Sequence, residues 1–282
     1  MTFEDVRNGL RELDERSLEV HGSRVRYYVG GDGPPLLLVH GLSGAAANWV
    51  ALAPLLVERF RVLIPDLPGH AGSSPLAGVK SLDPFAETVV ALAEHERMLP
   101  AALVGHSLGG LVALRLAVRR PEAVSGLVLV SAAGISTATR RVERLLRVSS
   151  FVRPSRFYSR FRARVGRSLA LRYLVFGYWG ASDPAALPPH VVEGFLSGPA
   201  LHTDTLTAAR ALARDDPRLD LELVRCPSLV LWGARDRQVP VADAFEYARR
   251  LRAPVRLVAD CGHLPIGERP DACADAITTF LT

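Results

Sequence analysis

Short apolar runs that do not alternate with polar residues recur along the chain. They fall at residues 36–39, 62–64, 102–104, 127–130, 229–231 and 255–258. Strands of a parallel sheet have this pattern, because helices cover both faces of such a sheet and leave no polar side. Segments with apolar residues at helical spacing separate most of the runs. The pattern predicts an α/β fold with a mostly parallel, doubly wound sheet and right-handed crossovers.

The helical segments fix the expected organisation of the chain. Helical spacing predicts helices over residues 3–13, 49–57, 84–98, 108–118, 242–251 and 272–281. Two further strands are expected at residues 18–20 and 25–29, joined by a turn at 21–23. From about residue 134 to 205, helical stretches follow one another without a convincing strand. We therefore expect a core of residues 1–133 and 206–282, with residues 134–205 inserted as a helical cap over the strand ends.

Composition narrows the class of protein. The 282 residues are 49% hydrophobic and 22% charged, as in a soluble globular domain. The first twenty residues resemble neither a secretory signal nor a membrane span, so a cytoplasmic location is expected. The three cysteines form no CxxC pair, which argues against a zinc site or a disulfide framework, and no metal is expected. The net charge of +5 is carried almost entirely by arginine and does not by itself predict nucleic-acid binding.

One glycine-rich turn carries the candidate nucleophile. Residues 105–109 read Gly-His-Ser-Leu-Gly, after an apolar run and before a segment with helical spacing. A G-x-S-x-G sequence between a strand and a helix holds its serine on a sharp turn, and the glycines leave room where helix and strand nearly touch. Ser107 is therefore the predicted nucleophile.

A serine hydroxyl needs a base, and the base needs an acid. His263 is the predicted base, because it alone of the eight histidines lies beyond the last apolar run. Asp236 follows the run at 229–231 and is the predicted acid, since it would fix the imidazole tautomer and stabilise imidazolium. Asp260, three residues before His263, is the alternative acid.

Donors for the oxyanion are expected from main-chain N–H groups. The turn at residues 40–44 is rich in glycine and follows the run at 36–39. The N–H groups of Leu42 and Leu108 are the predicted donors. Residues expected to contact the substrate are Gly41, Ser43, His106 and Trp49.

Five motifs in order carry a resemblance to a known family. They are HGLSG at 40–44, DLPGHAGS at 66–73, GHSLGG at 105–110, LVLWGARDRQVP at 229–240 and GHLPIGERP at 262–270. From about residue 20 onward the chain resembles the α/β-hydrolase superfamily, and within it the serine esterases and lipases with a helical cap, related to C–C bond hydrolases and cofactor-free haloperoxidases. The resemblance implies the α/β-hydrolase fold and a triad of Ser107, Asp236 and His263.

The resemblance and the residues together predict a hydrolase of small-molecule carboxylic esters, working through an acyl-enzyme on Ser107 without a cofactor. The alternatives are a C–C bond hydrolase of the meta-cleavage type, an acyl thioesterase, or a slow or non-catalytic ligand receptor on the same fold. The small, apolar run at residues 44–47 favours the esterase, with Asn48 the only polar contact available there.

The cap sequence is strongly basic. Between Arg140 and Arg172 it carries eleven arginines and a single acid, Glu143, interleaved with apolar and aromatic residues. Such a stretch suits weak contact with anionic lipid or an acidic substrate. The alternative is a solvated helix face in an arginine-rich chain.

Overall fold

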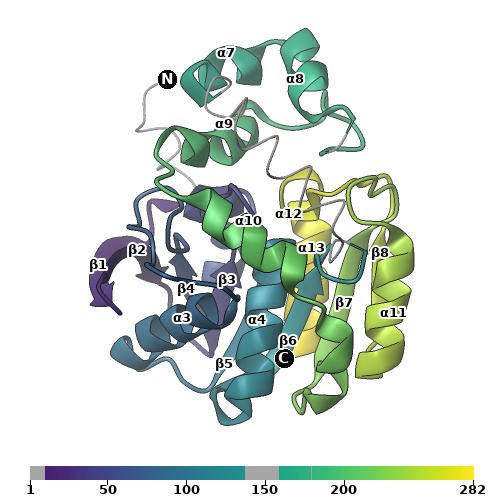
Figure 1. Cartoon of the computed structure of the whole chain (residues 1–282). Helices are drawn as coiled ribbons and strands as arrows, with labels where there is room; N and C mark the ends of the chain where they lie inside the picture. The colour runs from purple at the N-terminus through teal and green to yellow at the C-terminus, as the bar shows by residue number, and fades with distance from the viewer. Residues whose placement is uncertain (1–9, 137–158, 179) are drawn as a thin grey trace.

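A single twisted sheet runs through the molecule, in a computed structural model that describes residues 10–136, 159–178 and 180–282 (Figure 1). The strand order is β1-β2-β4-β3-β5-β6-β7-β8. Strands β1 and β2 are antiparallel to their neighbours, and all later pairs are parallel. This confirms the predicted mostly parallel sheet. The strands are β1 (Asp14–Val20), β2 (Ser23–Gly30), β3 (Pro35–Val39), β4 (Arg61–Pro65), β5 (Ala101–His106), β6 (Val124–Val130), β7 (Ser228–Gly233) and β8 (Val255–Val258).

Helices cover both faces of this sheet and explain the unbroken apolar runs. In β3, Leu37 and Val39 pack into one core layer, while Leu36 and Leu38 pack into the other. The first layer lies under α3 (Asp83–His95), α4 (Leu108–Arg119), α10 (Thr205–Arg214) and α11 (Val241–Leu251). The second layer lies under α2 (Ala53–Val57) and α13 (Pro270–Leu281). Alternate side chains of each central strand are therefore buried on opposite sides.

Four of the six predicted helices are found, as α3, α4, α11 and α13. The helix expected over residues 49–57 is two shorter elements, the 3-10 helix η2 (Ala46–Trp49) and α2. Pro54 stands in the first turn of α2, where its missing N–H costs nothing, but it cannot continue a preceding helix. At the N-terminus, the expected helix over 3–13 falls largely outside the described residues, and Leu13 directly precedes β1.

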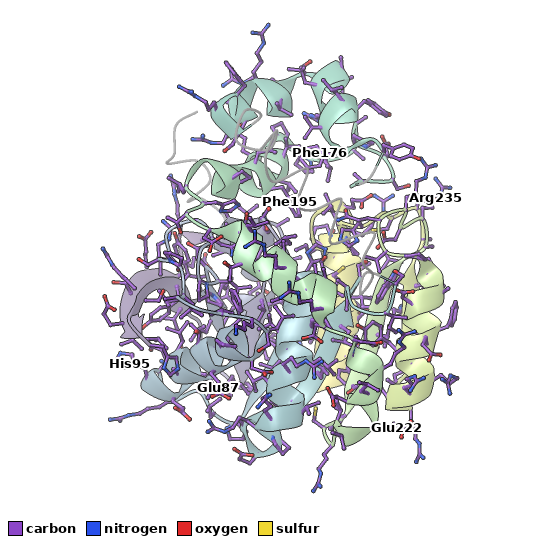
Figure 2. The ribbon with its side chains drawn as sticks, viewed as in Figure 1. Glu87, His95, Phe176, Phe195, Glu222 and Arg235 are labelled. Carbon is purple, nitrogen blue, oxygen red and sulfur yellow. The ribbon has the colours of Figure 1, made fainter. Side chains whose placement is uncertain are left out.

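The described part of the predicted cap is helical. It comprises α7 (Arg162–Arg167), α8 (Leu169–Phe176), α9 (Pro189–Ser197) and the 3-10 helix η4 (Gly198–Ala200), at the top of Figure 1. These helices share a small apolar cluster that includes Phe176 and Val192 and extends to Val50 and Leu264. Phe195 packs against this cluster and the second core layer (Figure 2). Residues 137–158 lie outside the described part, and the boundaries at 134 and 205 stay a prediction.

Two further findings concern the chain as a whole. Cys261 and Cys273 are buried and Cys226 is half-buried, and all three are free thiols. Within the described ranges, none of the helices has the length and apolar character needed to cross a membrane.

Candidate active site

Ser107 occupies a strained turn at the carboxyl end of the central strand. Strand β5 ends at His106 and α4 begins at Leu108, so Ser107 alone makes the reversal, with φ 53° and ψ −118°. Its N–H donates to the Val130 carbonyl at 3.0 Å. A Cβ at Gly105 would collide with the Gly109 carbonyl, and one at Gly109 with the Val39 carbonyl. The glycines are required because strand and helix touch here, which leaves the serine at the tip of the turn.

His263 and Asp236 meet beside the same edge of the sheet. Asp236 lies in the loop after β7, and its Oδ2 accepts a hydrogen bond from His263 Nδ1 at 2.8 Å. A carboxylate can only accept, so Nδ1 carries the ring proton and Nε2 is left as an acceptor. A neutral imidazole in this tautomer is able to take a proton from a hydroxyl group.

Asp236 is fixed in its charged form. Burial alone would raise the pKa of its carboxyl group. The hydrogen bond from His263, with the N–H groups of Gln238 and Val239 at 2.8 and 2.9 Å, outweighs burial and lowers that pKa below its ordinary value. The alternative acid, Asp260, is exposed and pairs instead with Arg235 at 2.5 Å.

His106 ties the Ser107 turn to the His263 loop. Its Nε2 donates to the His263 carbonyl at 2.8 Å, and the two ring centroids lie 5.1 Å apart. Burial lowers the pKa of His106 to about 3, so the ring is neutral at physiological pH. The residue predicted to contact substrate is therefore also a link between Ser107 and His263.

The turn at residues 40–44 lies against Ser107. A Cβ at Gly41 would stand 3.1 Å from the Ser107 Cβ, so the two backbones are in close contact. His40 holds this turn through Nδ1, which donates to the Gly41 carbonyl at 2.8 Å, and through Nε2, which accepts from the Leu67 N–H at 3.0 Å. Among the residues that the structure describes, neither the Leu42 nor the Leu108 N–H donates to a protein acceptor. Their role as oxyanion donors stays a prediction.

His202, from the segment after η4, holds this turn from the other side. Its Nδ1 accepts the Ala71 N–H at 2.9 Å, so Nε2 carries the proton and donates to the Ser43 carbonyl at 2.9 Å. It thereby connects the end of the predicted cap to two loops of the core. Sequence reasoning did not single out His202, because its partners are main-chain groups far away in the sequence.

Glu268, in α12 (Pro265–Glu268), is a second residue that the sequence did not single out. Its Oε1 accepts from the N–H groups of Gly262 and Leu264 at 2.9 and 3.2 Å, on either side of His263. Its Oε2 accepts from the Ser182 N–H at 2.7 Å, and the His263 N–H donates to the Gly180 carbonyl at 2.7 Å. The His263 loop is thus held between α12 and the segment that follows α8.

Trp49 and Asn48 are more deeply buried than residues that contact a substrate. Trp49 is fully buried in the second core layer, and its indole N–H has no partner among the described residues. Asn48 Oδ1 accepts from the Ala45 N–H at 3.0 Å, and Nδ2 donates to the Gly194 carbonyl at 3.4 Å. Both ends of the Asn48 amide are occupied by backbone groups, so it offers little to a substrate.

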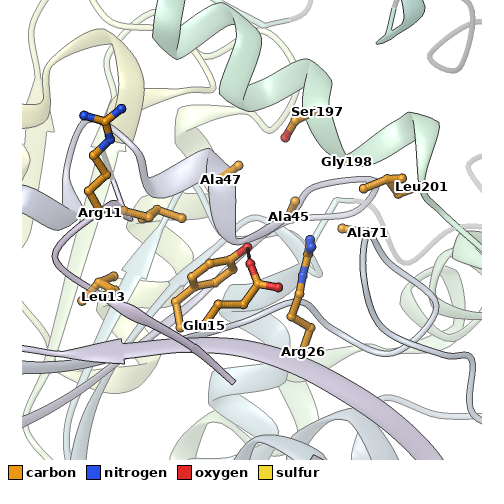
Figure 3. Close-up of a pocket in the computed structure, with 12 residues that line it drawn as sticks. Arg11, Leu13, Glu15, Arg26, Ala45, Ala47, Ala71, Ser197, Gly198 and Leu201 are labelled. Carbon is orange, nitrogen blue, oxygen red and sulfur yellow. Dashed lines mark hydrogen bonds between the residues drawn. The ribbon is translucent and has the colours of Figure 1, made fainter. Parts of the chain in front are cut away.

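A separate open hollow of about 410 Å³ lies between the β1–β2 ribbon, residues 45–47 and the α9–η4 corner (Figure 3). Its polar side chains are largely paired: Arg26 with Asp66, and Tyr28 with Glu15 at 2.9 Å. None of Ser107, Asp236 and His263 lines it. No group of three or more potential metal ligands occurs in the described ranges.

Comparison with known proteins identifies the family of this chain. Residues 36–276 match the alpha/beta hydrolase family. The chain belongs to this family. The pimeloyl-[acyl-carrier protein] methyl ester esterase of Nitrosomonas europaea is 31% identical to this chain. The match covers 88% of this chain and 96% of the esterase.

Two further relatives cover most of the chain. The dihydrolipoyllysine-residue acetyltransferase component of an acetoin cleaving system from Pseudomonas putida is 31% identical over 93% of this chain and 68% of its own length. The crystal structure of a membrane phospholipase A matches with a TM-score of 0.77 at 28% identity, covering 99% of this chain and 89% of that one. The α/β-hydrolase fold predicted from the sequence is confirmed.

Proposed function

We propose that this member of the family hydrolyses carboxylic esters through an acyl-enzyme on Ser107. The observation that carries the proposal is the 2.8 Å bond from His263 Nδ1 to Asp236, which leaves Nε2 as an acceptor at the edge of the sheet where Ser107 stands. An esterase and a phospholipase among the relatives support an ester as the substrate.

In the first step, the Ser107 Oγ attacks the ester carbonyl carbon while His263 Nε2 takes the hydroxyl proton. Asp236 stabilises the imidazolium that forms. The N–H groups of Leu42 and Leu108 donate to the carbonyl oxygen as it gains negative charge. When the tetrahedral intermediate collapses, the ester C–O bond breaks and His263 returns its proton to the departing alcohol.

In the second step, water attacks the acyl group on Ser107. His263 takes one proton from this water, and the intermediate collapses with the proton returned to the Ser107 oxygen. The carboxylic acid leaves and the free serine is restored. No cofactor enters either step.

The residues around Ser107 favour an ester over the alternative substrates. Gly41 and Ser43 would contact the acyl group from the turn at 40–44, beside the His106 ring. Trp49 is buried in the second core layer and would not take part. A C–C bond hydrolase needs polar groups for an enolate or dienoate, and the Asn48 amide that stood as the candidate is taken up by Ala45 and Gly194.

A panel of p-nitrophenyl esters with short and medium acyl chains tests the proposal. We expect Ser107→Ala to lose on the order of a millionfold in kcat, by analogy with the removal of other catalytic serines. A fluorophosphonate probe should label wild type at Ser107 and leave the variant unlabelled. Feeble turnover that is equal in both proteins, together with thermal stabilisation by the ester, would instead indicate a ligand receptor. Turnover of acyl thioesters but not oxygen esters would indicate a thioesterase.

A further inference from the structure

The outermost helix of the cap is apolar on its exposed side and charged on its buried side. The only charged residue of α8 is Arg172, which is 8% exposed. Its guanidinium donates to the Gly166, Ala185 and Leu187 carbonyls inside the cap, with Nε 2.8 Å from Gly166 O and Nη1 2.7 Å from Leu187 O. The guanidinium group therefore holds the cap together, and the solvent-facing side of α8 carries no charged side chain.

The exposed side of α8 and its flanks carries large apolar side chains. Leu174 is 67% exposed, Tyr178 66% and Leu169 57%. Five of the ten large apolar side chains that stand exposed in the described residues fall within this stretch, which we call the cap patch: Phe161, Leu169, Tyr173, Leu174 and Tyr178. The opposite side of α8 packs inward through Leu171, Val175 and Phe176. A helix that is apolar all round is ordinarily buried on every side. The large apolar side chains on the exposed side of α8 are therefore unusual for a surface in contact with water.

Arginines of the preceding segment border the cap patch. Arg160, Arg164 and Arg167 are exposed, and no ion pair of theirs occurs within the described ranges. From residue 159 to residue 182 the chain contains no aspartate or glutamate. In Figure 1, α7 and α8 form the top of the molecule, away from the core helices. An apolar surface edged by cations that have no ion pair in the described part of the chain is thus presented outward.

We propose that the cap patch docks on the surface of an anionic lipid bilayer. The leucines and Phe161 would enter the boundary between headgroups and acyl chains, and the tyrosines would lie at that boundary, where the Tyr173 hydroxyl group keeps its hydrogen bond to Asp183. Arg160, Arg164 and Arg167 would lie among the anionic headgroups, each adding favourable electrostatic energy. A second copy of this chain fits less well, because a two-fold interface through the patch would bring the same arginines face to face.

The docking surface is connected to the candidate active site by a short length of chain. After α8, the Gly180 carbonyl accepts the His263 N–H at 2.7 Å, and the Ser182 N–H donates to Glu268. Docking through α8 would therefore hold the bilayer close to the loop that carries His263. The proposal does not depend on which bond the enzyme cleaves.

Co-sedimentation with vesicles tests the docking surface. Vesicles of phosphatidylcholine alone are compared with vesicles of phosphatidylcholine and phosphatidylglycerol, at low and then rising NaCl concentration. We expect the full chain to sediment with the anionic vesicles only, and less so as salt screens the arginines. Equal binding to both kinds of vesicle, or no binding to either, overturns the proposal.

Variants locate the contact on the patch. Leu169→Ser combined with Leu174→Ser should weaken binding at least about tenfold, since two leucines no longer leave water. Arg164→Gln and Arg167→Gln should weaken it about fivefold each. The matched controls are Leu219→Ser, at a leucine that is 84% exposed away from the cap, and Arg256→Gln on β8, and both should bind as wild type.

Two measurements separate docking from its alternatives. The unfolding temperature of the leucine double variant should stay close to that of wild type. If it falls, the arginine variants test the patch instead, because they change only exposed side chains. Patch variants that bind anionic vesicles as tightly as wild type overturn the proposal. So does a wild-type dimer in sedimentation velocity that Leu174→Ser converts to monomer, because a second copy would then cover the patch.

Discussion

Ser107 has a backbone conformation that an L-residue seldom adopts, with φ 53° and ψ −118°. A Cβ in such a conformation is strained by roughly 1–3 kcal/mol, because it crowds the neighbouring carbonyl groups. The surrounding contacts, from the Val130 carbonyl to the Ala133 N–H, hold the residue there. The proposed nucleophile is therefore held at the tip of the turn at the expense of stability.

Removing the Cβ at this position should stabilise the fold. We expect Ser107→Gly to unfold with a free energy about 1 kcal/mol higher than Ser107→Ala, since the relief of strain exceeds the extra entropy of glycine in the unfolded chain. Urea denaturation followed by tryptophan fluorescence measures the difference. Both variants lack the Ser107 hydroxyl group, so activity does not enter the comparison.

Ser197 gives the matched control for this pair of variants. Its φ of −74° and ψ of −40° are ordinary helical values. There the order should reverse, with the alanine variant more stable than the glycine variant. If Ser107→Gly is also less stable than Ser107→Ala, the turn is not strained in the way its dihedral angles indicate.

Single residues differ in how far the sequence reveals them. Ser107, Asp236 and His263 follow apolar runs, and parallel strands bring their carboxyl ends to one edge, so the pattern predicts that the three lie together. His202 and Glu268 act on main-chain groups of segments far away in the sequence, at Ser43, Ala71 and Ser182. A hydrogen bond to a backbone group leaves no residue type to recognise, and such roles are visible only in the fold.

At the scale of elements, α12 supports the loop that carries His263. This four-residue helix places Glu268 where both carboxylate oxygens accept main-chain N–H groups, from Gly262, Leu264 and Ser182. The helix itself is too short to be stable alone, so these bonds join the loop, the helix and the segment after α8 into one unit. Glu268 is thus a positioning residue for His263.

Glu268→Gln should loosen this unit while keeping its shape. One carboxylate oxygen becomes an NH₂ group, which faces an N–H group and leaves it without an acceptor. We expect a loss of about 1–3 kcal/mol in unfolding free energy. We expect kcat to fall about tenfold or more with KM changed less, because His263 is displaced rather than the binding surface. Steady-state kinetics and urea denaturation measure both effects.

Glu222→Gln is the control for this change. Glu222 is exposed in the 3-10 helix η6 (Leu221–Leu223), and the substitution there alters charge by the same amount. It should leave kcat and stability near wild type. Equal kinetic constants for Glu268→Gln and wild type would show that the loop is held by other contacts.

Where one periodic pattern of apolar residues continues without interruption, it predicts a helix or strand that the structure contains. The helix over residues 49–57 was the exception, because apolar spacing continues through Pro54 while the backbone cannot. In α8, periodicity predicts a helix but does not say which side is buried, since leucine and aromatic residues lie all round it. The side that packs inside the cap is the one that carries Arg172, whose guanidinium group donates to main-chain carbonyls there.

At the scale of the molecule, the order of strands goes beyond what the pattern determines. Apolar runs mark the strands as buried, but nothing in them places β4 between β2 and β3. That order depends on contacts between distant residues, such as Leu37 of β3 beside Leu63 of β4. The same long-range packing buries histidines from separate loops, and their burial makes the stability of the fold depend on pH.

His40, His70 and His106 are buried and neutral in the folded protein. Burial lowers the pKa of His40 and of His106 to about 3, and that of His70 well below its ordinary value of 6.5. In the unfolded chain these rings take up protons as the pH falls below about 6.5. Between about pH 6.5 and 3 the unfolded state therefore binds more protons than the folded state. Stability must fall as the pH is lowered through this window.

We expect His40 and His106 each to lower the free energy of unfolding by about 2 kcal/mol at pH 5 relative to pH 7. Urea denaturation at the two pH values measures the loss. In His106→Asn the loss should be smaller by about one histidine's share, because asparagine does not take up a proton. His21→Asn, at an exposed turn, should keep the wild-type dependence. A free energy of unfolding that is the same at pH 5 and pH 7 would mean that water reaches these rings in the folded protein, and the packing of the turn at 40–44 against Ser107 would then be looser than described.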